Sequence, residues 1–217
     1  MTTQHDSAIT LKKETTFGTP VVVDASYPFT DTDLEYKPTL ADATSPYGAR
    51  VKSSAARVLV KSEVGGSFTT EGKTKGLGKL FEAALGVGVS NNISGSSYQQ
   101  LFTPLVDDYL PSYTIQLGVP LLGGAASAHT FAGMVCGGFE LTADNAAIPM
   151  IKWNWVGKSM ATDTAFVTPA YPASSIPFSF VGGTISSGTV TVPTTTALGS
   201  GTTTLANIRS INVNYDN

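Results

Sequence analysis

Apolar and polar positions alternate most regularly between residues 109 and 158. Residues 113–118, 131–141 and 151–156 each show the period of two that is typical of a half-buried strand. Because consecutive strands usually pair, this stretch predicts an antiparallel meander with one aromatic face. The residues expected on that face are Tyr113, Ile115, Leu117, Phe131, Val135, Phe139, Leu141, Ile151, Trp153 and Trp155.

A helical period occurs once, over about residues 74–85. Apolar residues recur there at i, i+3, i+4, i+7 and i+8 and form one stripe, while Lys75, Lys79 and Glu82 lie off it. Gly86 follows as a natural C-terminal stop. The stripe that we expect to pack in the core or at an assembly contact is Leu77, Leu80, Phe81, Ala84 and Leu85.

The rest of the chain is less regular. Residues 21–56 contain three prolines without a sustained period, which favours an extended arm with one or two short strands. Residues 87–97 and 194–204 are rich in Gly, Ser, Asn or Thr and predict loops. Further strands are predicted at 57–61, 65–71, 98–104, 178–181, 189–192 and 208–215.

These elements predict an all-β fold with one flanking α-helix. The 217 residues suit one domain, or one domain with a long elaboration, and can bury a substantial core without disulfides or metals. We divide the chain into an N-terminal segment and arm (1–56), a core that contains the helix (57–165), and Ser/Thr/Gly-rich loops with closing strands of the same domain (166–217).

Charge is scarce: 13% of residues are charged, about half of the roughly 25% usual in globular domains. No apolar run approaches the roughly 20 residues that a membrane span needs, so much of the surface is small and polar or is covered by a partner. A net charge of −3 gives no argument for tight binding of nucleic acid. The N-terminus has no apolar signal region, and the single Cys136 excludes an intrachain disulfide and fits a reducing cytosol.

Candidate chemistry is weak throughout. Residues 71–74, Glu-Gly-Lys-Thr, lie where a phosphate-binding loop would, but Ser67 stands where that motif needs glycine. His5, His129 and Cys136 are too few for a metal site, and residues 31–35 lack the glycine and closing glutamate of a calcium loop.

Candidate catalytic and ligand-stacking residues are also weak. The adjacent Asp107 and Asp108 would point apart on a strand or be solvated on a loop. Trp153 and Trp155 could stack on a sugar or base, although packing in a core or interface is the commoner role of such a pair. The sequence contains no enzyme signature, and we expect no cofactor and no metal.

Four segments, in order along the chain, resemble the major tail tube proteins of long-tailed bacteriophages. They are KKETTFGTP at 12–20, KGLGKLFEAALG at 75–86, HTFAGMVCGGFEL at 129–141 and SINVNYDN at 210–217. None carries chemistry, so the signal lies in their succession. Relatives often continue past the last strand, so we expect either a compact version of the fold or an incomplete sequence.

The resemblance implies a β-sandwich or half-barrel that assembles as hexameric rings, stacked into a tube that carries DNA from the capsid to the host. It implies a virion location, assembly in the host cytoplasm, and contacts with copies of itself, the tape-measure protein, the tail terminator and distal tail proteins, but not with a membrane. Ring closure would hide edge strands, and the arm and the 87–97 loop suit contacts with the next ring.

DNA must slide through such a tube, so strong phosphate binding would be harmful and a neutral or acidic lining is expected. Our hypothesis is that Glu71, Glu140 and Asp144 contribute to the lining. The alternative is a virion-associated β-sandwich that binds a carbohydrate or receptor through Trp153 and Trp155. That alternative requires exposed tryptophans, whereas the tube requires buried ones.

Overall fold

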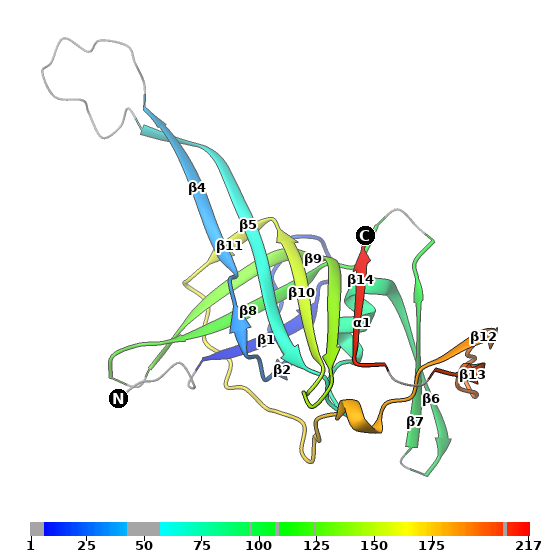
Figure 1. The fold of residues 1–217 in the computed structure, drawn as a ribbon. Helices are drawn as coiled ribbons and strands as arrows, with labels where there is room; N and C mark the ends of the chain where they lie inside the picture. Colours follow the sequence, from blue (N-terminus) through cyan, green and yellow to red (C-terminus); the bar gives the residue numbers. More distant parts are fainter. Residues whose placement is uncertain (1–6, 43–56, 96, 107–108, 124, 206–207) are drawn as a thin grey trace, which may run out of the picture.

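A computed structural model describes residues 7–42, 57–95, 97–106, 109–123, 125–205 and 208–217 (Figure 1). These residues form a ten-stranded antiparallel sheet, two separate two-stranded hairpins, one α-helix and a single 3₁₀ turn. The prediction of an all-β fold with one flanking helix is confirmed. The three stretches with alternating apolar residues, 113–118, 131–141 and 151–156, all lie in strands of the ten-stranded sheet.

The first half of the sheet is built around the beginning of β9 (Ala126–Asp144). β8 (Tyr113–Pro120) pairs with it on one side and β11 (Ser159–Ala161) on the other. β1 (Ala8–Lys13) pairs with β8, and β2 (Ala25–Tyr27) pairs with β1. The segment before residue 20, for which the sequence predicts no strand, therefore contributes β1 as an internal strand of the sheet.

The second half is built around the end of β9, between β10 (Met150–Gly157) and β14 (Ser210–Asp216). β10 pairs in turn with β5 (Arg57–Glu71), which also pairs with β3 (Asp31–Thr32) and β4 (Glu35–Asp42). The sequence predicts two strands within 57–71, but β5 runs through both as one. Its first half leaves the body with β4 as a two-stranded arm (Figure 1).

Two bulges in β9 change which residues face the core. Gly133 (φ +66°) and Gly138 (φ +148°) adopt backbone angles that other residues rarely tolerate, and the pairing register shifts near each. A strict period of two predicts Val135 on the core face. The structure instead leaves Val135 half-buried opposite the exposed Val156, and Met134 and Cys136 occupy the core positions.

Strand β8 also differs from the prediction of a half-buried strand. Tyr113, Ile115 and Leu117 are buried on one face, but Thr114 and Gln116 are buried on the other. The chain after β11 covers that second face: the Gln116 amide donates to the Ala165 carbonyl at 3.0 Å, and the Val167 N–H donates to the Gln116 Oε1 at 2.8 Å. This half of the sheet is therefore covered on both sides.

The helix α1 (Gly78–Leu85) ends where the sequence predicts but begins four residues later than expected. The Thr74 N–H donates to the Ile176 carbonyl at 2.9 Å. The chain just before the helix therefore pairs with a distant segment instead of forming the first helical turn. Of the predicted stripe, Leu80 and Ala84 are fully buried, and Leu77, Phe81 and Leu85 are half-buried. Ala83 is buried as well.

The predicted loops are partly strands. Within 87–97, residues 87–94 lie in β6 (Gly86–Ser94) and residue 97 begins β7 (Ser97–Pro104), and these two strands pair. β12 (Ser186–Thr191) pairs with β13 (Ser200–Thr204). The strand expected at 178–181 is replaced by the 3₁₀ turn η3 (Phe180–Gly182). Both hairpins lie beside the main sheet, on the side of α1 and β14 (Figure 1).

Candidate assembly surfaces

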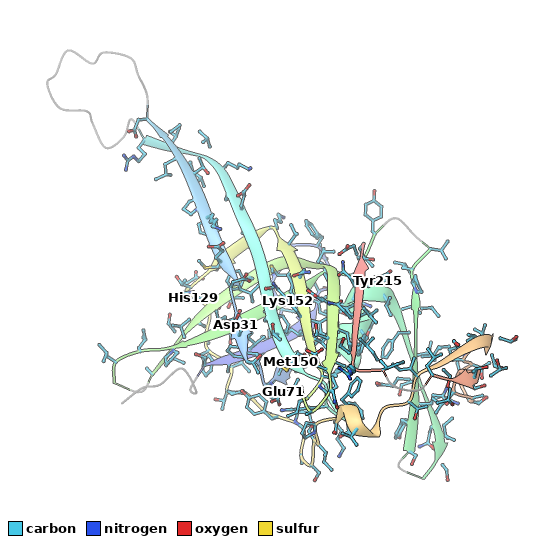
Figure 2. The ribbon with its side chains drawn as sticks, in the orientation of Figure 1. Asp31, Glu71, His129, Met150, Lys152 and Tyr215 are labelled. Carbon is cyan, nitrogen blue, oxygen red and sulfur yellow. The ribbon has the colours of Figure 1, made fainter. Side chains whose placement is uncertain are left out.

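The second half of the sheet is covered on one side only, and its open side is polar. Residues paired across strands point to the same side of a sheet, so the register defines rows such as Thr69, Lys152, Glu140 and Asn214. We call this open side, on β3, β5 from Ser67, β10, β9 from Gly138 and β14, the polar face (Figure 2). Its ionisable side chains are Asp31, Glu71, Glu140, Asp144, Asp216 and Lys152.

The structure brings the three residues predicted to line a lumen onto this one face. Glu140 lies within a strand and accepts a hydrogen bond from the Asn212 amide at 2.8 Å. Asp144 lies exposed at the end of β9, paired with Ser210 in the register. Glu71 lies at the end of β5 and forms an ion pair with Lys73, Nζ to Oε2 2.8 Å. The face is therefore weakly acidic and mostly uncharged.

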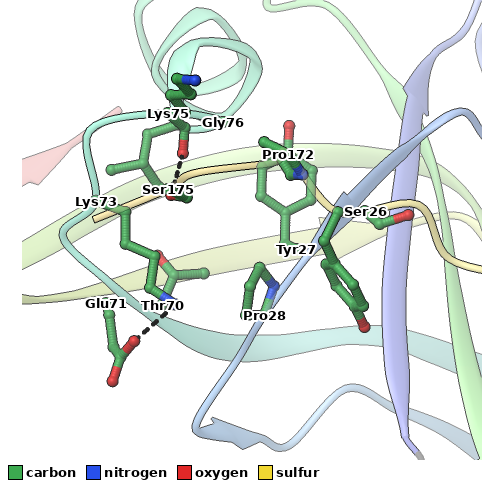
Figure 3. A pocket seen from close by; sticks show the side chains of 12 residues that line it. Ser26, Tyr27, Pro28, Thr70, Glu71, Lys73, Lys75, Gly76, Pro172 and Ser175 are labelled. Carbon is green, nitrogen blue, oxygen red and sulfur yellow. Dashed lines mark hydrogen bonds and ion pairs between the residues drawn. The ribbon is translucent and has the colours of Figure 1, made fainter. Parts of the chain in front are cut away.

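Lys73 also borders a cavity of about 40 Å³ between Tyr27 and Pro172 (Figure 3). The cavity has room for water but not for an organic ligand, since ligand pockets measure roughly 300–1,000 Å³. The ion pair between Glu71 and Lys73 lies at its edge. This cavity is thus a packing detail and not a binding site.

The polar face ends in open strand edges on both sides. Within the described residues, β14 pairs only with β9, and β3 and β4 pair only with β5. An open edge presents unpaired backbone N–H and C=O groups and invites another strand. Two such edges on opposite sides of one sheet can join copies in a row.

Beneath the polar face lies an aromatic layer. Trp153 is 0% and Trp155 2% exposed, and the Trp153 Nε1 donates to the Thr70 hydroxyl at 2.9 Å. Phe81 of α1 contacts the rings of Phe139 and Trp153, with centroids 5.5 and 5.1 Å away. The helix therefore covers the inner side of the sheet, and neither tryptophan is available to stack on a ligand.

Cys136 belongs to the same layer and is fully buried. Burial raises the pKa of its thiol from 9.0 to about 11, which keeps it protonated and unreactive at neutral pH. Within the part of the chain described here, no three His, Cys, Asp or Glu side chains gather as a metal site would need, and no helix is long and apolar enough to cross a membrane. His5, Asp107 and Asp108 lie outside the described residues.

An apolar groove of about 850 Å³ opens beside β14, on the helix side of the sheet. Phe81, Leu141, Ile151 and Ile211 line it from the body, and the segment around η3 forms its other wall. That segment is fixed by backbone pairing: the Phe178 N–H donates to the Gly72 carbonyl at 2.8 Å. We call this space the groove; its remaining lining residues include Phe178, Phe180, Val181, Ile185, Leu205 and Ile208.

A buried carboxylate fixes the turn after β1. Glu14 is 8% exposed and accepts four hydrogen bonds: from the backbone N–H groups of Gly18 (2.8 Å) and Gly133 (2.9 Å), and from the hydroxyls of Ser112 (2.8 Å) and Thr114 (2.9 Å). One side chain thus joins the N-terminal turn, the start of β8 and the first bulge of β9.

A comparison of the sequence with protein-family models shows which family the chain belongs to. The chain matches the phage tail tube protein family over residues 4–217, nearly its whole length. The chain belongs to the phage tail tube protein family. A comparison with curated proteins finds no match.

Membership confirms the resemblance seen in the sequence and makes the chain a structural component of the phage tail. The structure also gives physical reasons for two of the motifs that carried the resemblance. In the 12–20 motif, Glu14 and Gly18 form the carboxylate-centred turn. In the 129–141 motif, Gly133 and Gly138 form the bulges of β9.

The sequence interpretation missed Glu14 and Gln116, two buried polar residues that hold separate segments together. Both occur in segments that alternate or turn, where a polar residue is normally expected to be solvated. No local signal shows that the Glu14 carboxylate is buried, because three of its four partners come from residues about 98 to 119 positions away.

Proposed function

We propose that copies of this tail tube protein join edge to edge into hexameric rings, and that the rings stack into the conduit through which DNA passes into the host. The observation that carries the proposal is a sheet with two open edges and one open face that is polar and weakly acidic. Edge pairing between β14 of one copy and the β3–β4 side of the next would continue the sheet around a ring.

The dimensions are compatible with a DNA conduit. Each copy would contribute a sheet five strands wide: β14, β9, β10, β5 and the β3–β4 side. Six copies would then close a barrel of about 30 strands, on the order of 55–65 Å across at the usual strand spacing and tilt. A bore of that size admits a DNA duplex after inward side chains are allowed for.

The charge of the polar face supports the same assignment. In this proposal Glu71, Glu140 and Asp144 line the lumen together with neutral Thr and Asn side chains. Phosphate contacts from Lys and Arg supply most of the non-specific affinity for DNA, and Lys152 is the one basic residue among the ionisable side chains of this face. DNA would therefore slide without being held.

The remaining partners follow from such a tube. We propose that the lumen encloses the tape-measure protein before DNA enters, and that the tube ends meet the tail terminator and the distal tail proteins. Assembly would take place in the cytoplasm of the bacterial host. The alternative, a carbohydrate- or receptor-binding module, needs exposed tryptophans, and the burial of Trp153 and Trp155 removes that support.

The test combines negative-stain electron microscopy with selective labelling. We expect the purified protein to form hollow, striated rods. In Lys152→Cys rods, the polar face should react with a small maleimide but not with a maleimide carried on a large protein, because the carrier cannot enter the bore. Ser187→Cys, on the exposed hairpin strand β12, is the matched control and should react with both reagents.

Cys136 is buried and should not interfere in either variant. Unassembled protein of both variants should react with both reagents. Small particles without a hole would refute the tube itself. Intact rods in which Lys152→Cys reacts with the large carrier would refute the lumen assignment alone.

A further inference from the structure

The turn between β8 and β9 exposes two leucines where turns usually carry polar residues. Leu122 is 100% and Leu121 47% exposed, and the Leu121 N–H donates to the Ala125 carbonyl at 2.8 Å, which holds the turn closed. Residues 119–128 contain no ionisable side chain. We call Leu121 and Leu122 the leucine tip.

The groove has matching chemistry. None of its lining residues is ionisable, and Phe81, Leu141 and Ile151 form an apolar floor. On its rim, Phe178 is 51% and Val181 81% exposed. Water in a groove of about 850 Å³ would mostly face apolar walls. Such a surface indicates an interaction site.

The tip and the groove lie on opposite sides of the molecule. The β8–β9 hairpin reaches out on the left of Figure 1, whereas β14 and η3, which border the groove, lie on the right. One chain therefore cannot place its own tip in its own groove. A contact between unlike surfaces on opposite sides is heterologous, and it generates rings or open arrays instead of a two-fold dimer.

We propose that the leucine tip of one copy inserts into the groove of the next copy. The proposal rests on the proposed ring. A neighbour placed along the open edge of β14 presents its β3–β4 side there, and its β8–β9 hairpin extends in the same direction (Figure 1). Because the groove is on the helix side of β14, the tip adds a second contact behind the sheet edge.

The β4–β5 arm is a poorer occupant, although it also exposes leucines. Leu40 and Leu59 are paired across the arm and are 52% and 54% exposed. Ion pairs flank them, between Arg57 and Asp42 and between Lys61 and Glu63. Inserting the arm would bring these charges against a lining that has no ionisable partner, which is unfavourable. The leucine tip brings none.

Cysteine cross-linking of assembled protein tests the contact. A variant with Leu122→Cys is mixed with a variant with Val181→Cys, assembled, and treated with a short bismaleimide. We expect covalent dimers from the mixture and essentially none from either variant alone, because the contact joins unlike surfaces. The double variant should give a ladder that stops at the ring size. Buried Cys136 adds no accessible thiol.

Leu40→Cys mixed with Val181→Cys is the matched control for the arm. We expect no dimers from that mixture, and their appearance in place of tip-to-groove dimers would overturn the proposal. Dimers from Leu122→Cys alone would indicate a tip-to-tip contact and would also overturn it. Rods that assemble normally but give no tip-to-groove product would also overturn the proposal, but they would not contradict the proposed tube. Absence of rods from the wild-type protein would instead refute the proposed function.

A second measurement does not depend on cross-linking. Leu121→Ser with Leu122→Ser should raise the concentration needed for assembly by roughly tenfold or more per leucine, because each loses its burial in the groove. Leu198→Ser, at a position 79% exposed in the loop between β12 and β13, is the control and should leave this concentration within about twofold. Equal effects of the tip variant and the control would contradict the proposal.

Discussion

Replacing Glu14 with alanine should destabilise the fold strongly, because its buried carboxylate joins three separate segments of the chain. The substitution removes the acceptor of four hydrogen bonds. The hydroxyls of Ser112 and Thr114 can rotate toward other acceptors, but the backbone N–H groups of Gly18 and Gly133 cannot. Each buried N–H left without an acceptor costs roughly 1–3 kcal/mol.

For two N–H groups we therefore expect Glu14→Ala to lower the free energy of unfolding by about 2–6 kcal/mol, a large part of the roughly 5–15 kcal/mol typical of a native domain. The bond to the Gly18 N–H is only partly buried, so water can replace part of it and the loss should lie in the lower half of that range. Glu14→Gln keeps one carbonyl acceptor but turns an amide donor toward other donors, so its loss should be intermediate.

The assay is urea unfolding followed by tryptophan fluorescence, since Trp153 and Trp155 are buried and should respond to unfolding. It must be carried out on dilute, unassembled protein, because assembly adds stability that depends on concentration. Glu63→Ala removes an exposed partner of Lys61 and should leave the free energy of unfolding nearly unchanged, because solvent screens exposed ion pairs. A loss below about 1 kcal/mol for Glu14→Ala would refute the reasoning.

Two further predictions concern the core. Leu80→Asp places a charge at a position with 0% exposure and should abolish folding or assembly, whereas Lys79→Ala, on the exposed side of α1, should still give rods by microscopy; rods from Leu80→Asp would show that the helix packing is wrong. Because burial raises the pKa of Cys136 from 9.0 to about 11, the unfolded state loses its proton first, so stability should fall as pH rises from 9 to 11. Cys136→Ser should show a shallower fall in thermal-unfolding measurements across that range, and identical slopes would contradict the burial argument.

The sequence predicts those elements whose pattern comes from a single buried face. Tyr113, Ile115, Ile151 and Trp153 alternate strictly and are buried in strands. The signal for the end of the helix is also local, because Gly86, directly after Leu85, ends the helix with φ +93°. In both cases the residues that determine the structure lie within a few positions of one another.

Prediction fails where distant contacts determine the structure. Val135 has the parity of the core in the sequence, but two bulges turn it to the other face. Gln116 looks like the solvated side of a strand, yet the chain after β11 buries it. The start of α1 moves because Thr74 pairs with Ile176, about 100 residues later. The rules for periodicity contain no information about such partners.

The two halves of the sheet differ in how far the chain itself covers them. Around β8 both faces are covered and the polar side chains find partners inside the chain. Beyond the second bulge, the same strand β9 enters a half with one open face and an open edge at β14. The groove lies beside that edge, on the covered side. The bulges at Gly133 and Gly138 thus mark the change from a finished core to the surfaces that, in our proposal, only neighbouring copies complete.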